Sequence, residues 1–193
     1  MSFKKRIFNN TDIQAKDFGN ERFVNCKFKN LNFRFTNFTD CQFVNCDFSG
    51  SVFEITTFTD CRFPETNVSN IDFGDIDLKK CDFTDSYAKN CVFHKLKGGK
   101  FGERKKCNLK DSNFDNTKLD GSVFAWCDLN SVSFKKSNLT EAVFENCDLE
   151  NANFIGADLT SCGFRKCYIK NTNLDIEGFI KVGNSRGFVL MDE

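Results

Sequence analysis

Large apolar residues recur at every fifth position along almost the whole chain. The series runs from Phe8 to Phe93 and resumes, one residue out of phase, from Leu109 to Leu174. An α-helix would spread such residues around its circumference, and a β-strand would send alternate members to opposite faces. A coil that turns a corner after each five-residue side instead points every one of them inward. The period therefore predicts a solenoid of stacked turns.

The second half of the chain indicates how long one turn is, because Leu and Phe alternate there at each step of five. Leu109 and Leu129 lie 20 residues apart, as do Phe114 and Phe134. A square coil with four five-residue sides places like residues on the same side in successive turns. We therefore expect about 20 residues per turn.

The position two residues before each large one is consistently small and should also point inward. Cysteines at this position would form rows with ~4.8 Å between neighbours, which is too far for a disulfide. A straight row also cannot surround a tetrahedral ion, and the sequence has no CxxC pair. We therefore interpret the cysteines as small core residues, and we expect no metal and no cofactor. All 11 cysteines of the chain occupy this position: Cys26, Cys41, Cys46, Cys61, Cys81, Cys91, Cys107, Cys127, Cys147, Cys162 and Cys167.

Two segments, Ala157-Asp-Leu-Thr-Ser161 and Cys147-Asp-Leu-Glu-Asn151, follow an A(D/N)LXX pattern. The chain resembles the pentapeptide-repeat proteins in this pattern, which extends over about nine tenths of its length. The resemblance implies an all-β fold, the right-handed quadrilateral β-helix. The period alone gives the square solenoid but not its handedness.

The continuous repeat indicates a single domain over residues 1–193. We divide it into a first repeat block (1–93), a loop at the phase break (94–108), a second repeat block (109–174) and a C-terminal cap or dimerisation segment (175–193). Pro64 is the sole proline, so no proline-rich linker separates domains. The basic N-terminus is not followed by an apolar run, and no stretch reaches the length of a membrane span. We expect a cytoplasmic protein that does not bind membranes.

The formal net charge of zero conceals a segregation of charge along the chain. Residues 35–78 contain eight acidic residues and one basic residue, and residues 111–164 contain nine acidic and three basic residues. The second span covers ~13 Å at ~4.8 Å per turn, a length over which duplex DNA carries about eight charges. This density is DNA-like, although outward acidic residues also serve solubility. The candidate partner-binding carboxylates are Asp128, Glu141, Glu145, Asp148 and Asp158.

The repeat fails between Phe93 and Leu109, where the next large position would fall on Gly98. The intervening segment contains three glycines and six basic residues, which predicts a projecting surface loop. Its residue order does not match a phosphate-binding P-loop. Its candidate partner-binding residues are Lys95, Lys97, Lys100, Phe101, Arg104, Lys105 and Lys106.

Both ends of the chain depart from the repeat. Arg6, Lys16 and Glu21 occupy inward positions that are elsewhere small, which predicts a cap on the first turn. After Leu174, two apolar runs flank a Gly/Asn turn, which suggests a cap or a dimer contact. The candidate dimerisation residues are Phe179, Ile180, Val182, Phe188, Val189 and Leu190.

Enzymatic activity is not expected, because His94 is the sole histidine and the repeat itself places carboxylates at regular outward positions. Within the family, the chain with its single mid-chain loop resembles the quinolone-resistance proteins and the immunity proteins that accompany gyrase-targeting toxins. The resemblance implies a cytosolic, dimeric, DNA-like rod that binds DNA gyrase or topoisomerase IV and protects it from quinolones or peptide toxins. Two alternatives stay open: a structural or regulatory scaffold for an unrelated protein partner, and direct nucleic-acid binding through the basic segments, which we do not favour.

Overall fold

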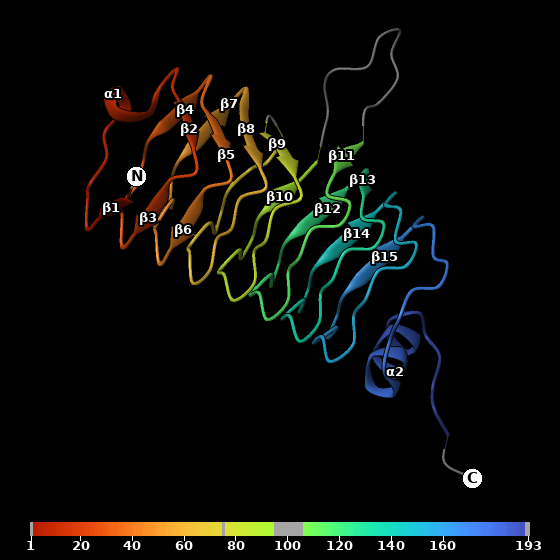
Figure 1. The fold of residues 1–193 in the computed structure, drawn as a ribbon. Helices are drawn as coiled ribbons and strands as arrows, with labels where there is room; N and C mark the ends of the chain where they lie inside the picture. Colours follow the sequence, from red (N-terminus) through yellow and green to blue (C-terminus); the bar gives the residue numbers. More distant parts are fainter. Residues whose placement is uncertain (1, 75, 95–105, 192–193) are drawn as a thin grey trace, which may run out of the picture.

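The computed structural model describes residues 2–74, 76–94 and 106–191, and it forms one elongated coil of stacked turns (Figure 1). The helices are α1 (Asn10–Ile13) and α2 (Ile176–Ser185). The strands are β1 (Ser2–Lys4), β2 (Asp17–Gly19), β3 (Arg22–Val24), β4 (Asn32–Arg34), β5 (Asn37–Thr39), β6 (Gln42–Val44), β7 (Val52–Glu54), β8 (Thr56–Thr59), β9 (Ile76–Lys79), β10 (Val92–Phe93), β11 (Cys107–Asn108), β12 (Val123–Ala125), β13 (Cys127–Asp128), β14 (Val143–Glu145) and β15 (Gly163–Arg165).

Successive turns pair in parallel with an offset of 20 residues, as in the Phe23↔Phe43 and Phe124↔Phe144 registers. We number the four faces of the coil in chain order. Face 1 contains β1, β3 and β6, and face 2 consists of single-residue bridges such as Ile7↔Lys27. Face 3 contains β4, β7, β10, β12, β14 and β15, and face 4 contains β2, β5, β8, β9, β11 and β13. This arrangement confirms the square solenoid predicted from the five-residue period and the quadrilateral β-helix that the family resemblance implied.

The corners of the coil explain the period. Among the described residues outside the two helices, the residue two positions after a large inward residue has left-handed backbone, for example Asn25 (φ 54°), Asp40 (φ 53°) and Gly50 (φ 71°). Gly lacks a β-carbon, and Asn and Asp tolerate this region better than other residues, which is why they recur there. One left-handed residue after every short extended side turns the chain, so each side is five residues long.

The inward residues form continuous stacks along the coil. The ring centroids of Phe23 and Phe43 lie 4.8 Å apart and nearly parallel, while Phe28 meets Phe23 edge-on at 5.5 Å. Stacked and edge-to-face pairs are the favoured aromatic geometries. Even Ala88, the weakest member of the series, is fully buried.

The small inward residues contribute hydrogen bonds as well as volume. Thr36 Oγ1 donates to the carbonyl of Ile13 at 3.0 Å, and Cys46 Sγ lies 3.4 Å from the carbonyl oxygen of Phe23. The same contact to the preceding turn recurs for most Cys, Ser and Thr at this position. The cysteines are therefore core residues, as predicted, but they also act as donors, which Ala at the same position cannot do.

The repeat continues across the segment where the sequence pattern fails, so the coil is not broken there. The registers Phe93↔Phe124 and Asp82↔Asn113 have an offset of 31 residues, which is one 20-residue turn plus 11 inserted residues. β11 begins at Cys107, two residues before the start assigned to the second repeat block. On face 4 the sheets β2-β5-β8-β9 and β11-β13 are separate, and among the described residues no backbone hydrogen bond joins β9 to β11. Face 3 is also divided, into β4-β7 and β10-β12-β14-β15, but its ladder continues across the insertion between β10 and β12.

The first turn has a polar cover. Arg6 lies over the rings of Phe3 and Phe8, 5.6 and 4.6 Å from their centroids, and its guanidinium is 2.6 Å from Asp12. α1 replaces one strand of this turn and begins with a capping box between Asn9 and Asp12. The inward position of Ile13 is kept despite the helix.

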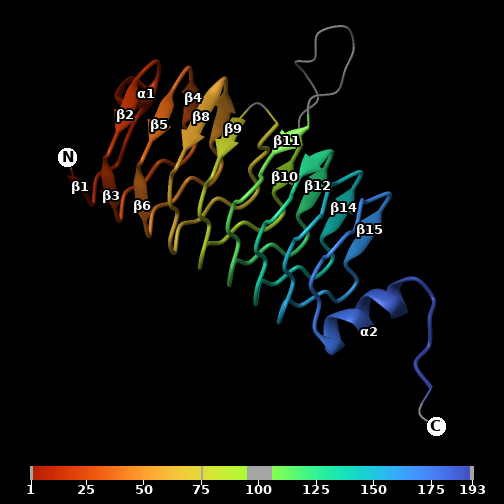
Figure 2. The same ribbon diagram turned by 45° about the vertical axis from the view of Figure 1, so that its right-hand side comes forward.

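The last turn is followed by α2, not by two runs around a turn. Gly183 and Asn184, which the sequence suggested as a turn, lie in the final turn of this helix. Asp175 caps its N-terminus by accepting from the Gly178 amide at 2.7 Å, and Val182 packs against the core. Figure 2 shows α2 beside the end of the coil. Neither helix of the described residues combines the length and apolar character needed to cross a bilayer.

Candidate binding surfaces

Face 4 carries the largest excess of acidic side chains, and we call it the acidic face. Its strands and the corners that follow them present eight carboxylates and four lysines outward, all exposed or half-buried. The other three faces are closer to balance. The eight carboxylates are Asp17, Asp40, Asp60, Asp77, Asp111, Asp128, Asp148 and Glu150.

The structure separates the five carboxylates predicted to bind a partner. Asp128 and Asp148 form a bridge between successive turns of the acidic face. Glu145 lies on β14 in face 3, in register with Arg165. Glu141 occupies the corner between faces 2 and 3 with a φ of 59°. A partner that covers one face therefore contacts a subset of these residues.

Asp158 lies on face 2 and is engaged within the protein. Its carboxylate accepts from the Thr160 hydroxyl at 2.6 Å and from Lys181 Nζ of α2 at 2.9 Å. The Thr160 hydroxyl, followed by Lys181, lowers the pKa of Asp158 to about 2. Because this contact anchors α2, Asp158 has a structural role whether or not a partner also reaches it.

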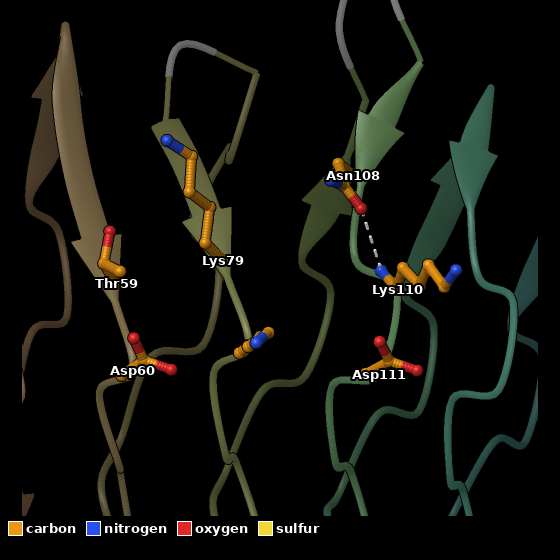
Figure 3. A pocket seen from close by; sticks show the side chains of 7 residues that line it. Thr59, Asp60, Lys79, Asn108, Lys110 and Asp111 are labelled. Carbon is orange, nitrogen blue, oxygen red and sulfur yellow. Dashed lines mark hydrogen bonds between the residues drawn. The ribbon is translucent and has the colours of Figure 1, made fainter.

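A groove of about 400 Å³ opens on the acidic face where the ladder between β9 and β11 is missing (Figure 3). Three lysines line this groove, Lys79, Lys80 and Lys110, and none of them makes an ion pair with another described residue. Their charges are therefore not neutralised by a neighbouring carboxylate, and the groove is a positively charged break in the acidic face. The lining residues are Thr59, Asp60, Lys79, Lys80, Asn108, Lys110 and Asp111.

The described residues that flank the predicted loop, His94 and Lys106, lie at the corner between faces 3 and 4. His94, at its start, is largely buried, and its Nε2 lies 2.9 Å from Asp72 Oδ1 in the preceding turn. A β-carbon on Gly74 would lie 2.6 Å from this imidazole, so the glycine makes room for it. Lys106 is exposed directly before β11. The other predicted loop residues lie outside the described residues: Lys95, Lys97, Lys100, Phe101, Arg104 and Lys105.

Three bulky apolar residues lie along the same corner, whereas the other corners have Asn, Asp, Gly or other polar residues. Phe35, Ile55 and Trp126 all have left-handed backbone, with φ of 54°, 49° and 57°. Phe35 and Ile55 are 48% and 66% exposed. We call these three residues the apolar corner. The sequence contains a signal for them, because each is a bulky apolar residue two positions after a large inward one. The five-residue period does not reveal this signal, since it concerns inward residues only.

The C-terminal segment presents a second apolar surface. A groove of about 420 Å³ is lined by the six predicted dimerisation residues together with Gly183, Asn184 and Arg186. Phe179 and Phe188 are 72% and 71% exposed, although Val182 also reaches the core. Exposed apolar surface of this kind marks interaction sites in soluble proteins.

Comparisons with known proteins agree with this architecture. The sequence profile described as "Pentapeptide repeat region" matches residues 16–93 and 103–174. No curated protein sequence matches the chain.

Two QnrB1 structures show the same fold at low sequence identity. A trypsin-treated variant of QnrB1, described as a plasmid-mediated fluoroquinolone resistance protein, is 17% identical with a TM-score of 0.61, and the alignment covers 100% of this chain and 99% of that one. Full-length QnrB1 is 17% identical with a TM-score of 0.53 and 97% of each chain covered. HetL from Nostoc sp. strain PCC 7120, described as involved in heterocyst differentiation regulation, is 12% identical with a TM-score of 0.29, covering 89% and 84%.

Proposed function

We propose that this chain, which belongs to the pentapeptide repeat family, is a binding protein without catalytic activity that protects a bacterial type II topoisomerase. In this proposal the acidic face occupies the DNA-binding surface of DNA gyrase or topoisomerase IV in the cytoplasm. The observation that carries the proposal is the excess of eight carboxylates over four lysines on one face of a rigid coil. Such a face complements a basic surface shaped to receive duplex DNA. The likeness to QnrB1 over the full length of both chains supports the proposal.

A supercoiling assay with purified gyrase and ciprofloxacin tests this function. The intact chain should restore supercoiling in the presence of the drug, and restoration should weaken as salt rises. No restoration at any protein concentration would overturn the proposal.

A pair of double variants tests the assignment to the acidic face. Asp128→Asn with Asp148→Asn removes two charges from that face, and about 1 kcal/mol of lost attraction would weaken protection about 5-fold. Glu141→Gln with Glu145→Gln removes the same charge from another part of the coil and should leave protection nearly unchanged. Equal losses in both variants would show that only total charge matters.

We also propose that two copies associate through the C-terminal groove. A symmetric dimer would bury the exposed rings of Phe179 and Phe188, which water otherwise surrounds. Light scattering of the Phe179→Ser, Phe188→Ser double variant should report a monomer. Ile7→Ser, which alters a residue 74% exposed on face 2, is the matched control and should stay dimeric. A dimer that persists in the C-terminal variant would exclude this interface.

A second function, a scaffold for an unrelated protein partner, is favoured by the apolar corner. Exposed apolar residues in a strained backbone region carry a cost that a bound partner would offset. Crosslinking and recovery from the native cytoplasm would separate the two functions. If topoisomerase subunits are recovered with the intact chain but not with the Asp128→Asn, Asp148→Asn variant, the result supports topoisomerase protection. If another protein is recovered with the intact chain but not with a Phe35→Ser, Ile55→Ser variant, the result supports the scaffold function.

A further inference from the structure

Cysteines of successive turns stack in straight rows inside the coil. The longest row lies behind the acidic face and contains Cys107, Cys127, Cys147 and Cys167, with Cys107 and Cys127 in direct register. A second row behind face 1 contains three cysteines, Cys41, Cys61 and Cys81. Every cysteine of the chain is a free thiol.

The spacing of such a row excludes the usual fates of paired cysteines. Parallel neighbours lie ~4.8 Å apart and their side chains point the same way, so their β-carbons are too distant for an unstrained disulfide. Among the described residues, no group of three or more His, Cys, Asp or Glu side chains is placed to hold a metal ion. Each pair of neighbours therefore places two sulfur atoms side by side along the row, unbonded to each other.

Soft cations that prefer linear coordination bind two sulfur atoms, with the metal midway on the line between them. A metal–thiolate bond is ~2.3 Å, so two bonds in a line span ~4.6 Å, close to the ~4.8 Å between strands. Thiolates select soft ions over Mg²⁺ or Ca²⁺. We propose that the long row binds two thiophilic linear cations, one between Cys107 and Cys127 and one between Cys147 and Cys167.

One end of the long row, Cys107, is only 2% exposed but borders a cavity, and the other end, Cys167, is half-buried. Cys107 helps to line a cavity of about 120 Å³ at the missing ladder between β9 and β11. Cys167, next to α2, is half-buried rather than buried. Cys41, Cys61 and Cys81 are at most 1% exposed. The long row therefore borders this cavity at one end and is partly exposed at the other, and an ion would approach it from these two ends.

Charge balance selects the ion. Binding breaks two S–H bonds, forms two metal–sulfur bonds and releases two protons to solvent, with no change of oxidation state. A divalent ion such as Hg²⁺ gives a neutral complex, which suits a buried site, whereas a monovalent ion leaves a net negative charge there. Because the thiols lose their protons when the metal–sulfur bonds form, binding tightens as pH rises.

Native mass spectrometry of the reduced full chain with Hg²⁺, in excess free cysteine, tests the proposal. We expect two ions per chain, each adding one metal and removing two hydrogens, and X-ray absorption should show two sulfur neighbours at ~2.3 Å. The Cys127→Ser, Cys147→Ser variant should bind none. Serine keeps the donor to the preceding turn, as Ser122 does at 2.7 Å from the Ala88 carbonyl oxygen.

The short row supplies the control. Cys41→Ser with Cys61→Ser removes the same number of buried thiols and should still bind two ions, and circular dichroism checks that both variants are folded. If the intact chain binds no ion against cysteine, or if a folded Cys127, Cys147 variant retains both ions, the proposal is wrong. Equal loss in the control would likewise overturn it, because binding would then not be specific to the long row.

Discussion

Replacing Ile55 by Asn should stabilise the protein, although it removes an apolar side chain. Ile55 has a φ of 49°, a region in which a β-branched residue clashes with its own backbone. The left-handed conformation costs an ordinary residue about 1–2 kcal/mol, and Asn relieves a large part of this cost. The side chain is 66% exposed, so its removal sacrifices only about a third of the ~2 kcal/mol that full burial of Ile provides. The expected net gain is about 0.5–1 kcal/mol.

Ile155→Asn is the matched control for this substitution. Ile155 is 46% exposed and is not among the left-handed residues, so Asn there loses apolar contact without relieving backbone cost. We expect a loss of about 1 kcal/mol, and thus a difference of about 1.5–2 kcal/mol between the two variants.

Urea unfolding followed by circular dichroism measures both variants. The comparison requires equal slopes of free energy against denaturant, because repeat proteins can lose their all-or-none transition. Equal destabilisation by the two substitutions would refute the argument from backbone conformation. If Ile55→Asn is stabilising and also abolishes recovery of a protein partner, the strained isoleucine is retained for binding.

Three further outcomes follow from the core and from α2. Phe134→Ala should lower the free energy of unfolding by about 3–5 kcal/mol and Phe134→Leu by less than about 1.5 kcal/mol, because Leu already fills equivalent positions; urea titration measures both. Thr117→Val should cost about 1–3 kcal/mol by the same method, since the Thr117 hydroxyl donates at 2.6 Å to the carbonyl of Phe83 across the insertion. Asp158 has a pKa lowered from 3.8 to about 2, so its contact with Lys181 stabilises the protein above about pH 4 and is lost as pH falls toward 2. Asp158→Asn should remove this pH dependence, and with the side chain 48% exposed the contribution is at most about 1 kcal/mol; hydrogen exchange of α2 between pH 2 and 5 checks it.

The five-residue period is sufficient to predict the core, because a large side chain that points inward must be apolar whatever the local backbone. Ile13 illustrates this: its burial was predicted, while the helix around it was not. The helix follows from a local signal, the reciprocal capping of Asn9 and Asp12, which a search for repeats passes over. The same applies to α2, where Gly183 indicates a turn because glycine is more common in turns than in helices.

The register across the insertion could not be predicted from the spacing. Sixteen residues separate Phe93 from Leu109, which reads equally well as three sides plus one residue or as one side plus 11 inserted residues. Only the pairing of the other three faces selects the second solution. Likewise, sequence charge counts gave the acidic spans but not the distribution of Asp128, Glu145 and Asp158 over three faces, since each turn sends its carboxylates in four directions.

Apart from the two ends, the irregular features of the coil lie along one edge, and the geometry of the insertion explains why. An 11-residue insertion between His94 and Lys106 adds chain at a single corner, so faces 1, 2 and 3 keep their ladders while the adjoining strands of face 4 separate. The apolar corner lies on the same edge, and the lysine-lined groove and the opening to Cys107 lie at the resulting gap. A ligand that bridges β9 and β11 would replace backbone contacts that this gap removes. Because each turn of a solenoid is stabilised mainly by its neighbours, such a ligand would couple the two repeat blocks more tightly than one bound elsewhere on the rod.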